Sequence, residues 1–253
     1  NNMIKNNIKL GIVIPCYNEE AIIADSLERI IEIIEQPQNK SLINECILCI
    51  VDDGSTDNSW ASINQIILNN KNENIKIIGL KLSTNFGHQN ALIAGMSEIN
   101  NQTDCIISID ADLEQDINAI SEFLKKYCEG NEIVLGIRNN RKGDNLLKKI
   151  TSKLFYFITK LSGSNIIKDH ADFRLLSNKI IKIILTFSEK DPFLRGIVSD
   201  LGFKTAYVNF NVKVIRERRS KYSFTKMLNF GFDSITTIGK LPLRLMSIIG
   251  TVI

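Results

Sequence analysis

The sequence predicts an α/β fold with a mostly parallel sheet and helices on both faces. Three apolar runs, at residues 10–15, 46–51 and 105–109, each lead directly into a polar loop. Near-continuous apolar strands that alternate with amphipathic helices are typical of parallel sheets buried on both sides. Such sheets bind ligands at the carboxyl ends of their strands, so we expect the functional residues in these three loops.

The other elements follow in chain order. After the first loop, apolar residues at Ile23, Leu27, Ile30 and Ile34 have the spacing of one buried helical face. Further elements are expected as helices from near residue 57 and over 117–127, strands over 75–80, 132–136 and 207–214, and an amphipathic helix over 224–239. The strand over 207–214 alternates apolar and polar residues, which predicts that only one of its faces is buried.

Composition limits the class of protein. At 253 residues and 44% hydrophobic content, the chain can bury the core of one large α/β domain. A formal net charge of +3 is too small to indicate a nucleic-acid partner. Five cysteines, an odd number, favour a reducing compartment. Cys46 and Cys49 lie inside a predicted strand, so we interpret them as core residues rather than as a redox or zinc motif.

The third polar loop begins with Asp110-Ala111-Asp112, two carboxylates at the end of a predicted buried strand. A bend there can turn both side chains toward one cation, and Mg²⁺ or Mn²⁺ commonly takes one or two carboxylates plus substrate phosphates. The alternative is a solvated acidic loop. The second loop, Asp52-Asp53-Gly54-Ser55, is also acidic, and Gly54 suits a tight turn because glycine accepts positive φ.

Several segments together resemble family 2 glycosyltransferases, which have the GT-A (Rossmann-like) fold. The segments are 13–20, 51–57, 85–89 and 110–113, in the family's order and spacing. Segments 172–176, 193–196 and 220–223 resemble the branch that transfers sugars to polyprenyl phosphate, which includes dolichyl-phosphate mannose synthases and bactoprenol glucosyltransferases. The resemblance covers about residues 8 to 250.

The resemblance implies inverting transfer of a hexose from a nucleotide-sugar, such as UDP-glucose, to undecaprenyl phosphate for cell-surface glycan or lipopolysaccharide modification. The residues that it assigns to the donor are Pro15, Tyr17, Glu19, Asp53, Asn85 and Asp110. It assigns a Mg²⁺ or Mn²⁺ ion to Asp110 and Asp112, and we expect Glu114 to assist directly or through water. Asp52 is expected to be structural.

A lipid phosphate is already anionic at neutral pH, so the protein has to supply positioning and cationic clamps rather than a general base. The candidate clamps for the acceptor phosphate are Arg138, Lys148, Lys149, Arg174, Arg218, Arg219 and Lys221. The expected catalytic residues are Asp112, Asp172, Arg138 and Lys221. Asp172 would act as a base if the acceptor were a hydroxyl group.

The C-terminal part predicts a membrane-associated segment. Six basic residues stand against one acid over residues 213–226, which favours anionic headgroups, with a solvated loop as the alternative. The apolar stretch 241–253 is too short to span a bilayer. The resemblance to the polyprenyl-phosphate branch, whose members often carry transmembrane helices after this point, leads us to expect such helices there, and the alternative is a terminal helix packed on the domain. We therefore divide the chain into a GT-A catalytic domain, 1–215, and a basic acceptor loop with juxtamembrane helices, 216–253. No signal peptide is recognisable, so we expect the cytoplasmic face of a bacterial inner (plasma) membrane, membrane lipid as a partner and a homo-oligomer.

Two departures from the family pattern leave alternatives open. Family members commonly have glutamine at the position of Glu114, and glycine shortly before the Ser220-Lys221-Tyr222 segment, where this chain has Arg218 and Arg219. The alternatives are a soluble family 2 enzyme that acts on a saccharide hydroxyl, and a non-catalytic GT-A domain that binds nucleotide or membrane.

Overall fold

The structure is a computed structural model that describes residues 7–139, 170–187 and 192–212. The chain divides into two compact units, the first formed by residues 1–139, 170–192 and 203–213, and the second by the remainder. The domain boundary expected at residue 215 stays a prediction, because most of the second unit lies outside the described residues. Lys148, Lys149, Arg218, Arg219, Lys221 and the predicted C-terminal helices also lie outside them.

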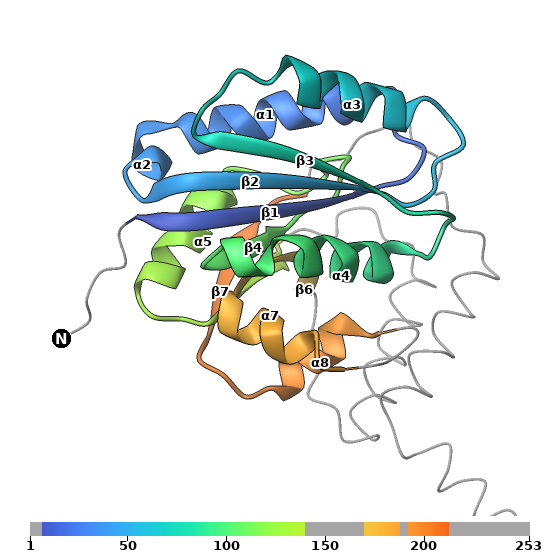
Figure 1. Cartoon of the computed structure of the whole chain (residues 1–253). Helices are drawn as coiled ribbons and strands as arrows, with labels where there is room; N and C mark the ends of the chain where they lie inside the picture. The colour runs from blue at the N-terminus through green and yellow to red at the C-terminus, as the bar shows by residue number, and fades with distance from the viewer. Residues whose placement is uncertain (1–6, 140–169, 188–191, 213–253) are drawn as a thin grey trace, which may run out of the picture. The chain divides into compact units, whose positions relative to one another are not determined.

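The first unit contains a seven-stranded sheet in the order β3-β2-β1-β4-β6-β5-β7 (Figure 1). Its strands are β1 (Ile8–Cys16), β2 (Ile43–Asp52), β3 (Ile75–Lys81), β4 (Cys105–Ser108), β5 (Ile133–Arg138), β6 (His170–Ser177) and β7 (Thr205–Phe210). β6 runs antiparallel to both of its neighbours, and every other pair is parallel. The predicted mostly parallel sheet is thus confirmed.

The helices of the first unit are α1 (Ile23–Glu35), α2 (Pro37–Lys40), α3 (Ser59–Asn69), α4 (His88–Ile99), α5 (Ala119–Cys128) and α7 (Asn178–Ile184), with a 3-10 turn η1 (Asn100–Gln102). In the second unit, the described residues include α8 (Leu194–Asp200). The four apolar positions predicted for the first helix are all buried in α1. Among the described residues, no helix has the length and apolar character that crossing a membrane requires.

Helices cover both faces of the sheet, as the sequence predicts. α1 and α3 lie over one face and α4 lies over the other (Figure 1). Alternate residues of β1 serve the two sides, because Leu10 and Ile12 belong to the core shared with α1, whereas Val13 meets α4. A Cβ atom at Gly95 of α4 would lie only 2.5 Å from Cγ1 of Val13. Gly95 therefore permits close packing of this helix.

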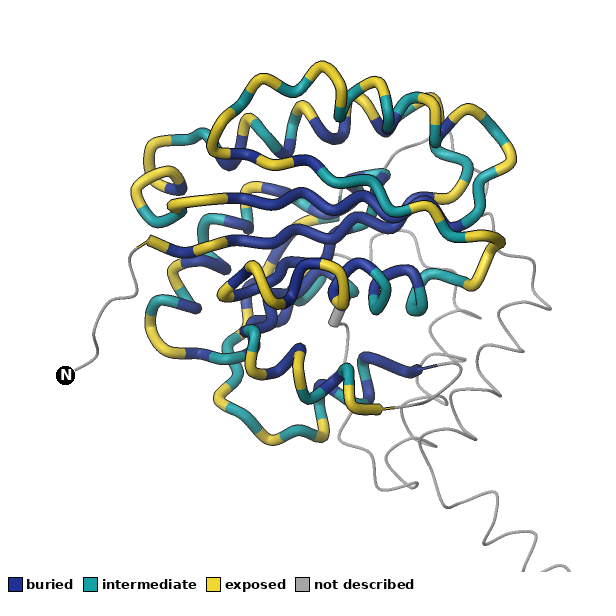
Figure 2. The backbone as a smooth tube through the Cα atoms, viewed as in Figure 1, coloured by how far each residue is buried: buried dark blue, intermediate teal, exposed yellow. Residues whose placement is uncertain are grey.

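β1 from Leu10 and β2 from Cys46 are buried to their ends, as their apolar sequences predict (Figure 2). Cys46 and Cys49 are both buried and free, which confirms their interpretation as core residues. In β7, Val208 and Phe210 are buried while Asn209 is exposed, so this strand has the expected single buried face.

Strand register brings the predicted loops to one edge of the sheet. Cys16 at the end of β1 pairs with Asp52 at the end of β2, and Val13 pairs with Ser108 at the end of β4. Because β6 is antiparallel to β4, with Arg174 opposite Ser108, its beginning lies at this same edge. Continuing that register by two residues sets Asp172 opposite Asp110. The polar loops therefore meet residues from a segment much later in the chain.

Candidate functional site

The loops that follow β1 and β2 are held together by side chains from both. Oδ1 of Asn18 accepts a hydrogen bond from the amide of Thr56 at 2.8 Å. The amide of Asn18 donates to Oγ of Ser55 at 3.0 Å, and the amide of Glu19 donates to Oγ of Ser59 at 2.8 Å. Asn18 has a φ of 54°, a backbone conformation that asparagine tolerates better than most residues. These contacts give the two loops a defined joint shape.

The predicted donor residues of the first loop differ in exposure. Pro15 is buried at the end of β1, whereas Tyr17 is exposed and Glu19 is partly buried. An exposed aromatic ring beside an ordered loop is suited to stacking on a flat base. The nucleotide contacts of these residues stay predictions.

Asp53 fixes the beginning of α4. Its Oδ1 atom accepts a hydrogen bond from the amide of Phe86 at 2.7 Å, and its Oδ2 atom accepts one from the amide of Gly87 at 2.9 Å. Burial raises the pKa of Asp53, while these two hydrogen bonds act in the opposite direction. Asp52 is fully buried, and its Oδ1 atom accepts from the amide of Ser55 at 3.2 Å. Asp53 thus has a structural role at the start of α4 that was not predicted from the sequence, in addition to its predicted role in the donor site.

Gly54 occupies a position that excludes other residues. Its φ is +69°, and a Cβ atom there would lie 2.4 Å from the carbonyl carbon of Thr84. Both the conformation and the close approach of the second backbone require glycine. The tight turn predicted for this residue is confirmed.

Three hydrogen bonds hold the Asp110-Ala111-Asp112 loop. Oγ of Ser26, on α1, donates a 2.6 Å hydrogen bond to the carbonyl oxygen of Ala111. The side-chain amide of Gln115 donates to Oδ2 of Asp110. Oδ1 of Asp112 accepts from the amide of Glu114 at 3.2 Å. The two carboxylates are therefore presented by a loop whose backbone and side chains are both held.

Asp110 and Asp172 approach each other at the sheet edge, with His88 beside both. Nε2 of His88 lies 3.5 Å from Oδ1 of Asp110 and 3.8 Å from Oδ2 of Asp172. Oδ1 of Asp172 accepts a 2.7 Å hydrogen bond from Nη2 of Arg174. Desolvation raises the pKa of Asp110, the imidazole of His88 lowers it, and the carboxylates of Asp172 and Asp112 raise it further.

The position of His88 beside these two carboxylates was not predicted from the sequence. Its place within segment 85–89 of the family resemblance was the available signal. Arg174, predicted as an acceptor clamp, is fully buried and holds Asp172, so contact with an acceptor phosphate stays a prediction. Arg138 ends β5 at the same edge and is partly buried, whereas Asn85 is exposed.

The residues present fit a divalent cation that is only partly held by protein. Among the described residues, no group of three or more His, Cys, Asp or Glu side chains is arranged as a complete metal site. Mg²⁺, however, typically uses one or two carboxylates and takes its remaining ligands from phosphates and water. Asp110 and Asp112 supply such a pair. Burial, and after it the carboxylates of Asp172 and Asp112, raise the pKa of Asp110, and a cation would offset both effects.

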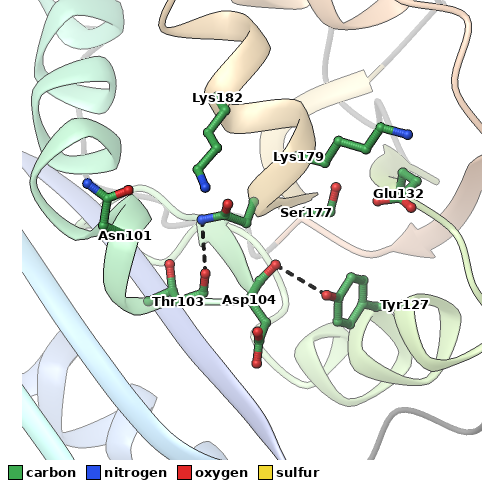
Figure 3. A pocket seen from close by; sticks show the side chains of 9 residues that line it. Asn101, Thr103, Asp104, Tyr127, Glu132, Ser177, Lys179 and Lys182 are labelled. Carbon is green, nitrogen blue, oxygen red and sulfur yellow. Dashed lines mark hydrogen bonds between the residues drawn. The ribbon is translucent and has the colours of Figure 1, made fainter.

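A separate polar pocket lies at the opposite edge of the sheet (Figure 3). It has a volume of about 340 Å³ and includes Asp104, immediately before β4, and Ser177, at the end of β6. Within it the hydroxyl of Tyr127 donates to the carbonyl oxygen of Asp104 at 3.2 Å. Because ligands of parallel sheets bind at the carboxyl ends of the strands, we assign the functional site to the other edge.

Comparison with known proteins identifies a family to which the chain is similar. The family described as Glycosyl transferase family 2 matches residues 11–188. The chain is 41% identical over 245 residues to an uncharacterized glycosyltransferase, YkoT, of Bacillus subtilis (strain 168), covering 96% of this chain and 72% of the relative. It is 31% identical over 251 residues to a prophage bactoprenol glucosyl transferase homolog of Escherichia coli (strain K12), covering 97% and 77%.

Two further similarities extend the comparison. An undecaprenyl-phosphate 4-deoxy-4-formamido-L-arabinose transferase of Photorhabdus laumondii is 32% identical over 246 residues, covering 97% of this chain and 72% of the relative. Among solved structures, the mannosyltransferase PcManGT of Pyrobaculum calidifontis, in complex with GDP-Man and Mn²⁺, matches with a TM-score of 0.55 at 12% identity. That match covers 83% of this chain and 58% of the other, and it supports the fold alone.

Proposed function

The chain belongs to glycosyl transferase family 2, and on that premise we propose that it transfers a sugar from a nucleotide-sugar to polyprenyl phosphate. The observation that carries the proposal is the meeting of Asp110 and Asp172 at one edge of the sheet. The first belongs to the donor-side motif and the second to the segment that resembles the acceptor-side motif. Relatives named for bactoprenol and undecaprenyl phosphate, similar over nearly the whole chain, support this acceptor.

The donor is proposed to bind over the joined loops after β1 and β2. Tyr17 is available to stack on the base, and Pro15, Glu19, Asp53 and Asn85 would complete the nucleoside contacts. We propose a UDP-sugar such as UDP-glucose, in line with the glucosyl transferase name of a relative. The hydrogen bonds between the loops keep this surface ordered before the donor arrives, which reduces the entropy lost on binding.

Asp110 and Asp112, with Glu114 close by, are proposed to hold Mg²⁺ or Mn²⁺ against the donor diphosphate. A bound cation would act as a Lewis acid on the phosphate oxygens as the leaving group gains charge. The chain's own contribution is to hold the carboxylates in place. Gln115 restrains Asp110, and Ser26 restrains the loop backbone through Ala111.

The acceptor is proposed to enter from the β5–β6 side of the edge. Its phosphate is anionic and needs no general base, so the demand falls on cations that align it with the anomeric carbon. Arg138 is the described candidate, and Lys148, Arg218, Arg219 and Lys221 are the candidates outside the described residues. Arg174 holds Asp172 from within the sheet. Attack from the side opposite the leaving diphosphate would invert the anomeric configuration.

The cellular setting follows from this chemistry. A polyprenyl phosphate is anchored in a membrane, whereas nucleotide-sugars are made in the cytoplasm. We therefore propose that the enzyme works at the cytoplasmic face of a bacterial plasma membrane, with the basic stretch 213–226 drawn to anionic lipid.

A second candidate function is transfer to a saccharide hydroxyl. Unlike a phosphate, a hydroxyl must lose a proton to attack, and Asp172 offers a carboxylate at the proposed catalytic edge. Its side chain is 12% exposed, which leaves limited access for an acceptor. This limited access makes a saccharide hydroxyl the less favoured acceptor.

The test is to incubate the full chain in anionic lipid vesicles with undecaprenyl phosphate and a panel of radiolabelled UDP- and GDP-sugars, with Mg²⁺ or Mn²⁺. We expect one nucleotide-sugar to yield a labelled lipid extractable into organic solvent. A matched reaction with Asp112→Ala controls for sugar carried over without catalysis. Failure of every donor to label the lipid, with an intact folded protein, would contradict the proposal.

A further inference from the structure

We infer that His88 is a positioning residue that couples the donor-side carboxylate of Asp110 to the acceptor-side carboxylate of Asp172. This inference rests on the proposed function, because it is glycosyl transfer that gives the two carboxylates their separate sides. His88 would contact neither substrate. Its effect would pass through the two aspartates.

The contacts of the two carboxylates match each other. Asp110 has one oxygen held by Gln115, five residues further along the chain, and its other oxygen lies 3.5 Å from Nε2 of His88. Asp172 has one oxygen held by Arg174, two residues further along, and its other oxygen lies 3.8 Å from the same nitrogen. A neighbour from the local chain thus restrains each carboxylate on one side, and His88 is shared on the other.

Asp110 follows β4 and Asp172 lies in the adjacent β6. Two carboxylates this close repel each other and would separate if nothing lay between them. Nε2 of His88 lies within 4 Å of both carboxylates and makes no hydrogen bond to either in this structure. A small movement of the imidazole would let it donate to one of the two oxygens, which would counter this tendency. Only a narrow range of separations then remains open to the pair. Under the proposed function, Asp110 holds the donor's metal and Asp172 lies on the acceptor side. The distance between the two carboxylates would then affect how donor and acceptor are aligned, and so the rate of transfer.

His88 is itself held from the opposite direction. It is the first residue of α4, and the two preceding amides donate to the buried carboxylate of Asp53 at 2.7 and 2.9 Å. The residue that follows β2 therefore holds the start of the helix, which sets the backbone position of His88. Such outer support is what sets the geometry of functional side chains in preorganised sites.

The chain allows a test by side-chain length. The amide nitrogen of glutamine reaches about as far as Nε2 of histidine, whereas that of asparagine reaches only as far as Nδ1. If His88 acts by reaching the two carboxylates, His88→Gln should retain much of the wild-type behaviour and His88→Asn should resemble His88→Ala. If His88 only packed against its neighbours, the activities of the three variants would not follow this order.

The deciding experiment is a double-mutant cycle of His88→Ala and Asp172→Asn, measured on the full chain. The affinity for Mn²⁺ is followed by electron paramagnetic resonance with UDP present, and separately with GDP. We expect the two substitutions to depart from additivity by at least about threefold, as residues in contact do. We also expect His88→Ala to lower kcat at least about tenfold while the KM for the nucleotide-sugar changes less than about threefold. Ser97→Ala, on the exposed end of α4, serves as the control.

A second cycle makes the test independent of the proposed function. The same variants are unfolded in urea without ligand, and the coupling in the folding equilibrium constant should again exceed about threefold. If the wild type binds Mn²⁺ with neither nucleotide, the proposed metal fails, and this second cycle decides the inference alone. The coupling role of His88 would be overturned if the effects of the two substitutions were additive within about twofold in the Mn²⁺ cycle, or in the urea cycle where the metal has failed. It would also be overturned if His88→Gln and His88→Asn changed kcat equally.

Discussion

Asp53 accepts a hydrogen bond from the backbone amide of Gly87 at 2.9 Å, so the end of β2 holds the first turn of α4. The same carboxylate accepts from the amide of Phe86, and it is buried. A residue that the sequence assigns to the donor is therefore also a structural link between two of the predicted site loops.

Replacing Asp53 with alanine should weaken both stability and nucleotide binding. Two backbone amides would lose their acceptor, so we expect the free energy of unfolding in urea to fall by about 1–3 kcal/mol. Calorimetry should show weaker UDP or GDP binding. Asp25→Ala, at an exposed site on α1, should change neither quantity measurably. Unchanged nucleotide affinity in the Asp53 variant would remove Asp53 from the donor site.

Gly54→Ala and Gly87→Ala should separate strain from steric clash. Both glycines have positive φ, +69° and +91°, so alanine is strained at each by about 1–3 kcal/mol. Only at Gly54 would the new Cβ also meet backbone, whereas nothing lies within 4 Å at Gly87. Urea unfolding should therefore show a larger loss for Gly54→Ala. Equal losses would mean that the close approach of residues 84 and 85 relaxes freely.

The hydrogen bond from Ser26 to Ala111 should stabilise the Asp-Ala-Asp loop. Ser26→Ala leaves a buried carbonyl oxygen without its partner, which should cost about 1–3 kcal/mol of unfolding free energy. Ser41→Ala removes an equivalent bond, to Gln38, at an exposed site where water replaces it. We expect that control to lose less than about 0.5 kcal/mol. A larger loss in the control would contradict the reasoning from burial.

Removing the proposed metal ligand should remove turnover. Asp112→Ala should lower kcat/KM at least about a hundredfold, because Lewis-acid stabilisation of the leaving diphosphate is worth several kcal/mol. EDTA should abolish wild-type activity, and Mg²⁺ or Mn²⁺ should restore it. Glu122→Gln, an exposed change on α5, controls for loss of negative charge. Full activity in EDTA would contradict the assignment of a metal ion to Asp110 and Asp112.

Local sequence pattern was sufficient for the half of the site that follows β1, β2 and β4. Apolar strands that end in polar loops, together with parallel pairing, place Asp53 and Asp110 at one edge without further information. The burial of Cys46 and Cys49 followed from the same pattern. These features depend on residues close together in the chain.

The other half depends on contacts between distant segments. Asp172 reaches the edge because β6 enters the sheet antiparallel between β4 and β5, and no local pattern specifies that register. Arg174 was predicted as a clamp for the acceptor phosphate, yet the same register buries it beside Asp172. The position of His88 follows only when α4, β4 and β6 are placed together, which is why it could not be predicted from the sequence.

The central claim, that the acceptor is a polyprenyl phosphate, is tested most directly by competition between acceptors. Undecaprenyl phosphate, undecaprenol and a free saccharide are offered together to the full chain in vesicles, with the labelled nucleotide-sugar that supports turnover, and the products are separated by chromatography. The account predicts label on the lipid phosphate and none on the alcohol, because the phosphate supplies the nucleophilic oxygen. Label on the free saccharide with none on the lipid phosphate would contradict it.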